Sequence, residues 1–76
     1  MRKEVQQFAK LMNQRLEENS HKDKYGWSEL SKDELTSKIE DNCVSVWFAE
    51  SSEEILIHAA DIANYAMMIA DNCRED

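Results

Sequence analysis

The sequence predicts an all-α fold, a small helical hairpin or bundle of about three helices. The chain has 76 residues with one glycine and no proline, which leaves little material for the tight turns of a sheet. Its apolar residues recur at steps of three and four, the period of a helix. A chain of this length makes one domain at most and buries only about 60% of its unfolded surface. We therefore expect a single domain, residues 1–76, with a core that is marginal on its own.

The first predicted helix spans about residues 2–18. Charged and amide side chains fill most of its positions, and its apolar residues share one face. These apolar residues are Val5, Phe8, Met12 and Leu16. The following segment, residues 19–30, holds the only glycine, two lysines and a histidine, so we expect a loop there.

Two further helices are expected over about residues 32–49 and 52–73. Each begins at a capping-box spacing, Ser31 with Glu34 and Ser51 with Glu54. Because so few residues separate them, these helices should form an antiparallel hairpin. The apolar stripe expected on the first of them consists of Leu35, Ile39, Cys43, Val46 and Trp47.

The last predicted helix is apolar over most of its circumference, which predicts burial on several sides. Three helices of this size cannot cover it, so we expect a homo-oligomer, a dimer or larger, that completes the core between subunits. Trp47 and Phe48 are adjacent and therefore point in different directions, which favours a subunit contact for one of them.

The charge balance is acidic, with 9 Lys and Arg against 16 Asp and Glu and a formal net charge of −7. Such a chain repels phosphate backbones, so long nucleic acid is not an expected partner. The sequence begins without a signal-peptide pattern, and its apolar run is too short and polar to span a bilayer, so no membrane association is expected. Two cysteines make no disulfide framework, and a reduced, cytoplasmic setting is the simplest interpretation.

Polar side chains interrupt the last helix along one narrow stripe. At about 100° per residue this stripe contains Glu54, His58, Asp61, Tyr65 and Asn72, flanked by Asn64 and Met68. The middle of the preceding helix, around Asn42, Cys43 and Ser45, should face it. Buried polar groups must be hydrogen-bonded, bind an ion or reduce stability. The stripe is therefore either a satisfied polar network, a wet groove or a ligand site.

Three segments resemble the MazG-like, all-α nucleotide pyrophosphohydrolase superfamily, in particular its short phage and bacterial members. "HAADIANYAMMIADN", residues 58–72, is similar to that group's E-A-A-D-V-A-N-F-A-M-M-I-A-D-N helix. "HKDKYGW", residues 21–27, resembles its His-Lys loop ending in Gly-Trp. "LTSKIEDNCVSV", residues 35–46, stands where the family has L-x-x-K-L-E-E-E-V-x-E-L. The resemblance covers most of the chain and implies the MazG-like fold.

The resemblance also implies a metal site, and four positions carry it. In the family, two pairs of carboxylates hold Mg²⁺, which positions a nucleoside triphosphate for hydrolysis to monophosphate and pyrophosphate. Those positions fall here on Asn42, Ser45, His58 and Asp61, and only Asp61 keeps its acid. Asp61 is thus the remaining metal candidate. The candidate ligand-binding residues are Lys22, Lys24, Trp27, Lys38 and Asn64, with Trp27 serving either to stack on a base or to anchor the loop.

The sequence contains two other sets of residues that could bind a metal. Glu40, Asp41 or Glu54 could rebuild an Mg²⁺ site in a shifted register, although Asp41 and Glu40 point away from the direction of Asn42. Cys43, His58 and Asp61 could together hold Zn²⁺, although their spacing is no established zinc signature.

The expected function is that of a catalytically impaired MazG-like protein which acts by binding, either a nucleotide-like ligand or a host protein, without a cofactor. By analogy, a phage-type antagonist of a host system would suit a small acidic protein of this origin. The alternatives are an active pyrophosphohydrolase that uses Mg²⁺ in a rearranged site, and a purely structural helical interaction module.

Overall fold

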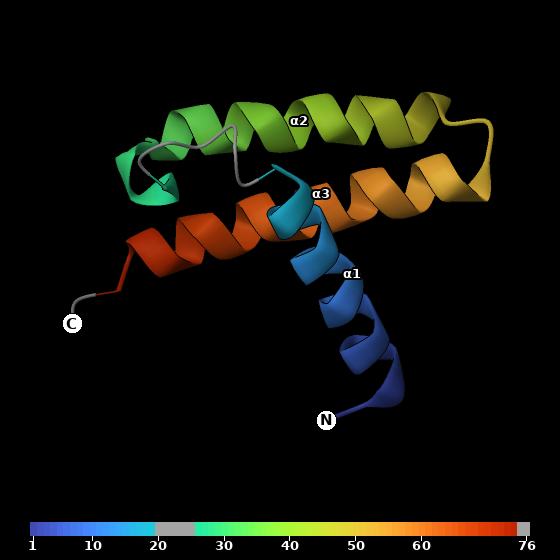
Figure 1. Cartoon of the computed structure of the whole chain (residues 1–76). Coiled ribbons are helices and arrows are strands. Elements are labelled where there is room, and N and C mark those ends of the chain that lie inside the picture. Colours follow the sequence, from blue (N-terminus) through green and yellow to red (C-terminus); the bar gives the residue numbers. More distant parts are fainter. Residues whose placement is uncertain (20–25, 75–76) are drawn as a thin grey trace.

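A computed structural model gives the fold and describes residues 1–19 and 26–74. These residues form helices α1 (Lys3–Asn19), α2 (Lys32–Phe48) and α3 (Ser52–Asn72), a short 3₁₀ helix η2 (Trp27–Glu29), and no strand (Figure 1). The all-α prediction is confirmed for this part of the chain. Each α-helix end lies at or next to the position expected from the sequence, whereas η2 falls within the segment expected to be a loop.

Helices α2 and α3 form an antiparallel hairpin (Figure 1). Each begins at a serine whose hydroxyl oxygen accepts a hydrogen bond from the backbone N–H three residues later. Glu34 N–H donates to Ser31 Oγ at 3.1 Å, and Glu54 N–H donates to Ser51 Oγ at 3.2 Å. These bonds satisfy donors that a helix start would otherwise leave unpaired. The chain therefore has a local signal for turning back after α2.

Helix α1 crosses the middle of α3, and its N-terminal end projects away from the hairpin (Figure 1). Among the described helices it packs against α3 and not against α2. Residues 1–7 are all exposed, while Met12, Arg15 and Leu16 are at least half-buried. Helix α1 is thus attached mainly through its C-terminal half, and Phe8 is the one partly buried residue before Leu11.

The segment before α2 is fastened to the C-terminal end of α3. Gly26 has φ 77°, a conformation that favours glycine because other residues would place a Cβ against the backbone. The Asn72 side chain donates to the carbonyl oxygens of Trp27 at 3.0 Å and Leu30 at 3.4 Å. The indole N–H of Trp27 donates to Asp71 Oδ2 at 2.9 Å. Trp27 therefore anchors η2 to α3.

The core is small. Among the described residues, the buried apolar side chains are Leu35, Ala60 and Met68, joined by the polar Asn64. Cys43 and Trp47, which belong to the apolar stripe expected on α2, are exposed, so this stripe is only partly buried within the chain. The reason is that α3 covers a narrow strip of α2 and no other helix covers the rest. None of the described helices is both long and apolar enough to cross a membrane.

Candidate functional site

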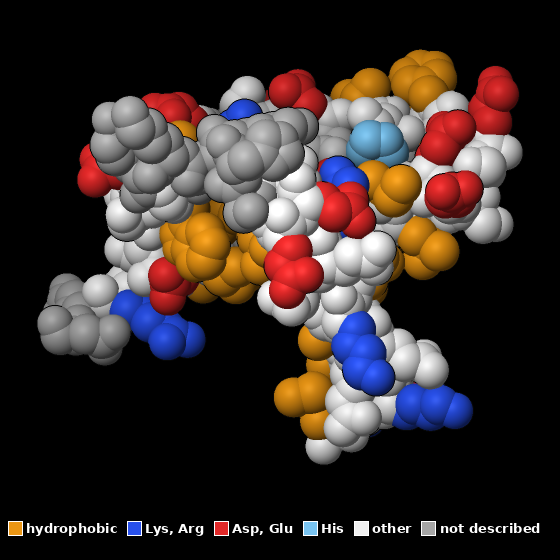
Figure 2. Space-filling view, viewed as in Figure 1, with side chains coloured by type: hydrophobic (Ala, Val, Ile, Leu, Met, Phe, Trp, Pro, Cys, Tyr) orange, Lys and Arg blue, Asp and Glu red, His pale blue; other side chains and the backbone are white. Residues whose placement is uncertain are grey.

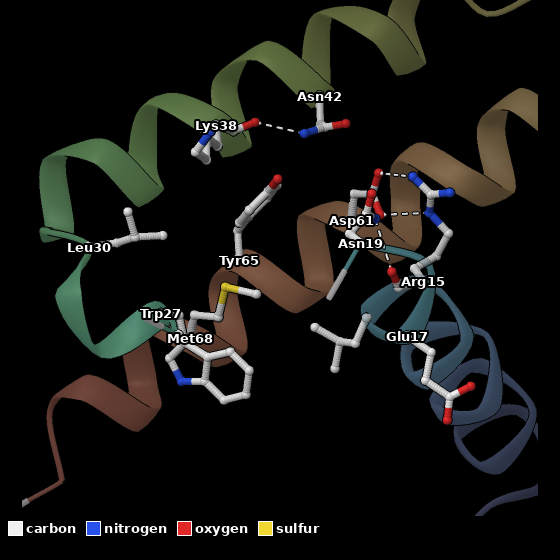
Figure 3. A pocket seen from close by; sticks show the side chains of 12 residues that line it. Arg15, Glu17, Asn19, Trp27, Leu30, Lys38, Asn42, Asp61, Tyr65 and Met68 are labelled. Atoms are coloured by element: carbon white, nitrogen blue, oxygen red, sulfur yellow. Dashed lines mark hydrogen bonds and ion pairs between the residues drawn. The ribbon is translucent and has the colours of Figure 1, made fainter. Parts of the chain in front are cut away.

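A cleft of about 860 Å³ opens where α1, η2, α2 and α3 converge (Figure 3). It brings together residues that are far apart in the sequence. Those that carry its chemistry are Arg15, Trp27, Lys38, Asn42, Asp61 and Tyr65. Its described ionisable side chains other than tyrosine are two cations, Arg15 and Lys38, and two acids, Glu17 and Asp61, so their formal charges cancel.

Asp61 is bound by Arg15 from α1. Arg15 Nε lies 2.9 Å from Asp61 Oδ1, and Arg15 Nη2 lies 2.9 Å from Asp61 Oδ2 (Figure 3). The two side chains are 20% and 16% exposed, so water competes little for either group. A planar guanidinium and a carboxylate can form two parallel hydrogen bonds, and this bidentate arrangement is the strongest common form of ion pair. Both oxygens of Asp61 are therefore engaged by a cation.

This hydrogen bonding to Asp61 raises the pKa of Arg15, although burial opposes the shift. Arg15 also donates to Glu18 Oε2 through Nη1 at 2.9 Å, and this contact is more exposed. The guanidinium thus bridges two acids and stays charged throughout the physiological pH range.

Asn42 and His58 form a second polar pair between α2 and α3. The Asn42 amide nitrogen donates to the Lys38 carbonyl oxygen at 2.9 Å, which leaves its Oδ1 facing His58 Nδ1 at 2.9 Å. Because an amide oxygen only accepts, the ring proton in this arrangement lies on Nδ1. Asn42 and His58, two of the residues singled out in the sequence, therefore hydrogen-bond to each other.

Tyr65 projects from α3 toward α2, and its ring lies beneath the Lys38 amino group, 5.9 Å from the ring centroid (Figure 3). Burial and then the negative charge of Asp61 raise the pKa of the Tyr65 phenol, while Arg15 acts in the opposite direction. The phenol therefore stays protonated and is available as a hydrogen-bond donor in the cleft.

Two other predicted site residues lie elsewhere. The Ser45 hydroxyl donates to the Asp41 carbonyl oxygen at 3.2 Å, within its own helix. Asn64 is 3% exposed and donates to the Met12 carbonyl oxygen at 2.9 Å, so it fastens α1 to α3. Neither is among the residues that line the cleft. Lys22 and Lys24 lie outside the described residues.

The donor set fits neither Mg²⁺ nor Zn²⁺. Within the described ranges 1–19 and 26–74, no group of three or more His, Cys, Asp or Glu side chains is placed to hold a metal ion. Mg²⁺ requires several hard oxygen ligands, and Asp61 already has both oxygens on Arg15. Glu40, Asp41 and Glu54 therefore rebuild no site with Asp61, and exposed Cys43 builds none with His58 and Asp61.

Sequence reasoning missed Arg15. The signal was present, because Arg15 lies three positions after Met12 and four after Leu11, on the apolar face of the first helix. Asp61 likewise interrupts an otherwise apolar helix. A lone cation and a lone acid on two buried faces pair because each would otherwise be an unpaired charge.

No protein-family model, curated protein or solved structure matches this chain.

Proposed function

We propose that the chain is a catalytically impaired MazG-like protein that binds a nucleotide-like ligand in the cleft without hydrolysing it. The observation that carries this proposal is the two-point ion pair between Arg15 and Asp61. The MazG-like resemblance, which rests on the three quoted segments, supplies the ligand class.

Impaired catalysis follows from the charges at the four family positions. Mg²⁺-assisted hydrolysis needs anionic oxygens that neutralise the metal and hold it in place. Here Asn42 and His58 hydrogen-bond to each other and supply no carboxylate, and the Ser45 hydroxyl donates to the backbone of its own helix. The single remaining carboxylate is compensated by a guanidinium. The arrangement thus supplies no net negative charge to attract the metal.

The size of the cleft and the residues that line it suit a nucleotide-like ligand. The cleft of about 860 Å³ lies within the usual range of roughly 300–1,000 Å³ for small-molecule sites. Trp27 and Tyr65 offer aromatic surface for a base. Lys38 supplies a cation, and Asn42 supplies an amide whose hydrogen bonds can rearrange. Loss of the metal acids favours direct contact between ligand phosphate and protein cations, because fewer carboxylates repel it.

We further propose that the protein acts in the cytoplasm as a homo-oligomer. Cys43 and Cys73 are both exposed free thiols, which suits a reducing compartment. The small core and the exposed Trp47 and Phe48 support association between copies.

Calorimetric titration with a panel of nucleoside triphosphates and monophosphates tests binding, and release of pyrophosphate in the presence of Mg²⁺ or Mn²⁺ tests hydrolysis. We expect heat of binding without turnover. Trp27→Ala should weaken binding, whereas Trp47→Ala, a matched change 82% exposed and outside the cleft, should not. Turnover that is abolished by Asp61→Ala would contradict impaired catalysis and support an active hydrolase. Absence of both binding and turnover would instead favour an interaction module.

A further inference from the structure

The molecule exposes more surface than a compact chain of its mass. Its accessible surface is 6095 Å² for 8.9 kDa. Folded monomers of this mass expose about 4,800 Å², so the excess is on the order of 1,300 Å². A specific interface typically removes about 800 Å² from each partner. The excess is therefore large enough to supply one interface per copy.

Part of this surface consists of exposed large apolar side chains toward the turn end of the hairpin. We call it the hairpin-tip patch and define it as Val44, Trp47, Phe48, Ile55 and Leu56, which are 57%, 82%, 72%, 43% and 53% exposed. Both α2 and α3 contribute to it. Exposed aromatic side chains on adjoining helices are typical of protein interfaces, where tryptophan is strongly enriched among the residues that dominate binding.

The patch has an acidic border. Glu50, Glu53 and Glu54 lie in or beside the connection between the two helices, and all three are exposed. Residues 39–73 contain seven acids and no lysine or arginine. Figure 2 shows acidic side chains around this end of the hairpin. A partner that covers the patch should therefore be apolar and basic.

The N-terminal arm, which we define as residues 1–10, has that composition. It contains the cations Arg2, Lys3 and Lys10 and the single acid Glu4. Met1 and Val5 are 89% and 50% exposed. The arm projects away from the hairpin of its own chain (Figure 1), with basic side chains along it (Figure 2). It is thus an amphipathic basic segment in which every residue except the partly buried Phe8 is exposed.

We propose that the arm of one copy lies across the hairpin-tip patch of a second copy, and that the second copy's arm returns the contact in a two-fold dimer. The chain itself supplies both complementary surfaces. In a two-fold dimer, each arm contacts the patch of the other copy, so both arms and both patches are covered. The assembly is then closed, and neither surface remains to bind a third copy. This inference rests on the homo-oligomer of the proposed function and names its interface.

Charge reversal tests the pairing. Arg2→Glu with Lys3→Glu reverses the arm, and Glu50→Lys with Glu53→Lys reverses the border of the patch. Arg2 precedes α1 and Lys3 is its first residue, whereas Glu50 precedes α3 and Glu53 lies in its first turn. All four are exposed, so neither reversal removes a buried contact. Dimer dissociation is measured by light scattering and sedimentation, with circular dichroism to verify helix content.

Either reversal alone should weaken the dimer by roughly tenfold or more, because it places like charges against each other. An equimolar mixture of the two reversed chains should form a heterodimer, since each arm then meets a tip of opposite charge. Lys32→Glu with Arg74→Glu is the control, because it changes the net charge as much as the arm reversal at exposed sites outside both surfaces.

Three results would overturn the inference. Reversals that leave dissociation unchanged would place the interface elsewhere while the oligomer stands. A control as disruptive as the arm reversal would show general repulsion instead of a specific contact. A wild-type chain that stays monomeric would remove the oligomer itself. The reversed residues do not line the cleft, so nucleotide affinity should be the same in the reversed chains as in the wild type. Failure of the dimer proposal can therefore be distinguished from failure of nucleotide binding in the cleft.

Discussion

The guanidinium of Arg15 on α1 meets the carboxylate of Asp61 on α3 edge to edge, with two nitrogen–oxygen distances of 2.9 Å. The two residues are 46 positions apart. This contact has two effects at once, because it fastens α1 to the hairpin and compensates the charge of Asp61 in the cleft. The position of α1 and the chemistry of the cleft are therefore coupled.

We expect Asp61→Asn to lower the free energy of unfolding by about 1–3 kcal/mol, since it leaves a largely buried guanidinium with a neutral partner. Urea denaturation followed by circular dichroism measures the change. Glu18→Gln removes the other, more exposed partner of Arg15 and should cost under about 1 kcal/mol. In a double-mutant cycle with Arg15→Met, the two losses should fail to add. Additive losses would show that the pair contributes no coupling.

Placing acids at the positions that the MazG-like resemblance assigns to the metal should reveal competition between Arg15 and a metal ion. The triple change Asn42→Glu, Ser45→Glu and His58→Glu should permit Mg²⁺ binding, and Arg15→Gln should strengthen it by about tenfold or more. A unit charge about 4 Å away is worth about 1–4 kcal/mol, depending on exposure. Calorimetric titration with Mg²⁺ alone measures both affinities.

The control for this experiment is Lys32→Gln in the triple background, which removes a cation outside the cleft. It should change the Mg²⁺ affinity far less than Arg15→Gln does. If neither background binds Mg²⁺, the assignment of the four family positions is wrong.

The Tyr65 phenol should titrate above its ordinary pKa of 10.0, because burial and the Asp61 charge oppose ionisation. Phenolate absorption in a Tyr25→Phe variant reports Tyr65 alone, since the chain has two tyrosines. Asp61→Asn should lower this pKa, because it removes the negative charge that opposes ionisation. The positive charge of Arg15, which favours the phenolate, is then no longer compensated by Asp61. An unchanged midpoint would mean that Asp61 does not act on the phenol.

The raised pKa has a consequence for stability. Below pH 10 the folded and unfolded chains both hold the proton, and the contribution to stability is fully present. Above that pH the unfolded chain ionises first, so stability falls as pH rises through the folded-state pKa. Tyr65→Phe should remove this part of the alkaline loss.

The serine caps should each contribute measurably to the hairpin. Ser51→Ala and Ser31→Ala should each lower the free energy of unfolding by about 1 kcal/mol, because a backbone N–H at each helix start loses its acceptor. Ser52→Ala, one position into α3, should have little effect. Thermal denaturation compares the three variants, and equal effects of Ser51→Ala and Ser52→Ala would argue against a capping role.

The hairpin could be predicted because its signals are local. The serine and glutamate at each helix start, and the few residues between the helices, determine where the chain turns. The cleft could not be predicted in the same way. It depends on where α1 crosses α3, and no local pattern encodes the position that places Arg15 beside Asp61.

The exposure of apolar side chains on α2 shows a second limit of prediction from sequence. Cys43 and Trp47 have the spacing of a buried stripe, yet both are exposed. Helical periodicity identifies an apolar face, but it does not tell whether that face is covered within the chain. Val44 and Phe48, outside the expected stripe, are exposed as well, so apolar side chains of α2 point in several uncovered directions.

The attachment of α1 through residues distant in sequence also determines the order in which the molecule folds. Pairing of α2 with α3 closes a short loop, whereas Arg15 and Met12 must find partners 46 and 52 positions away. Short closures cost less entropy and form sooner. Because synthesis proceeds from the N-terminus, α1 leaves the ribosome before α2 and α3, yet it docks after those two helices have paired. The apolar face of α1 therefore stays uncovered by α3 until α3 has been synthesised.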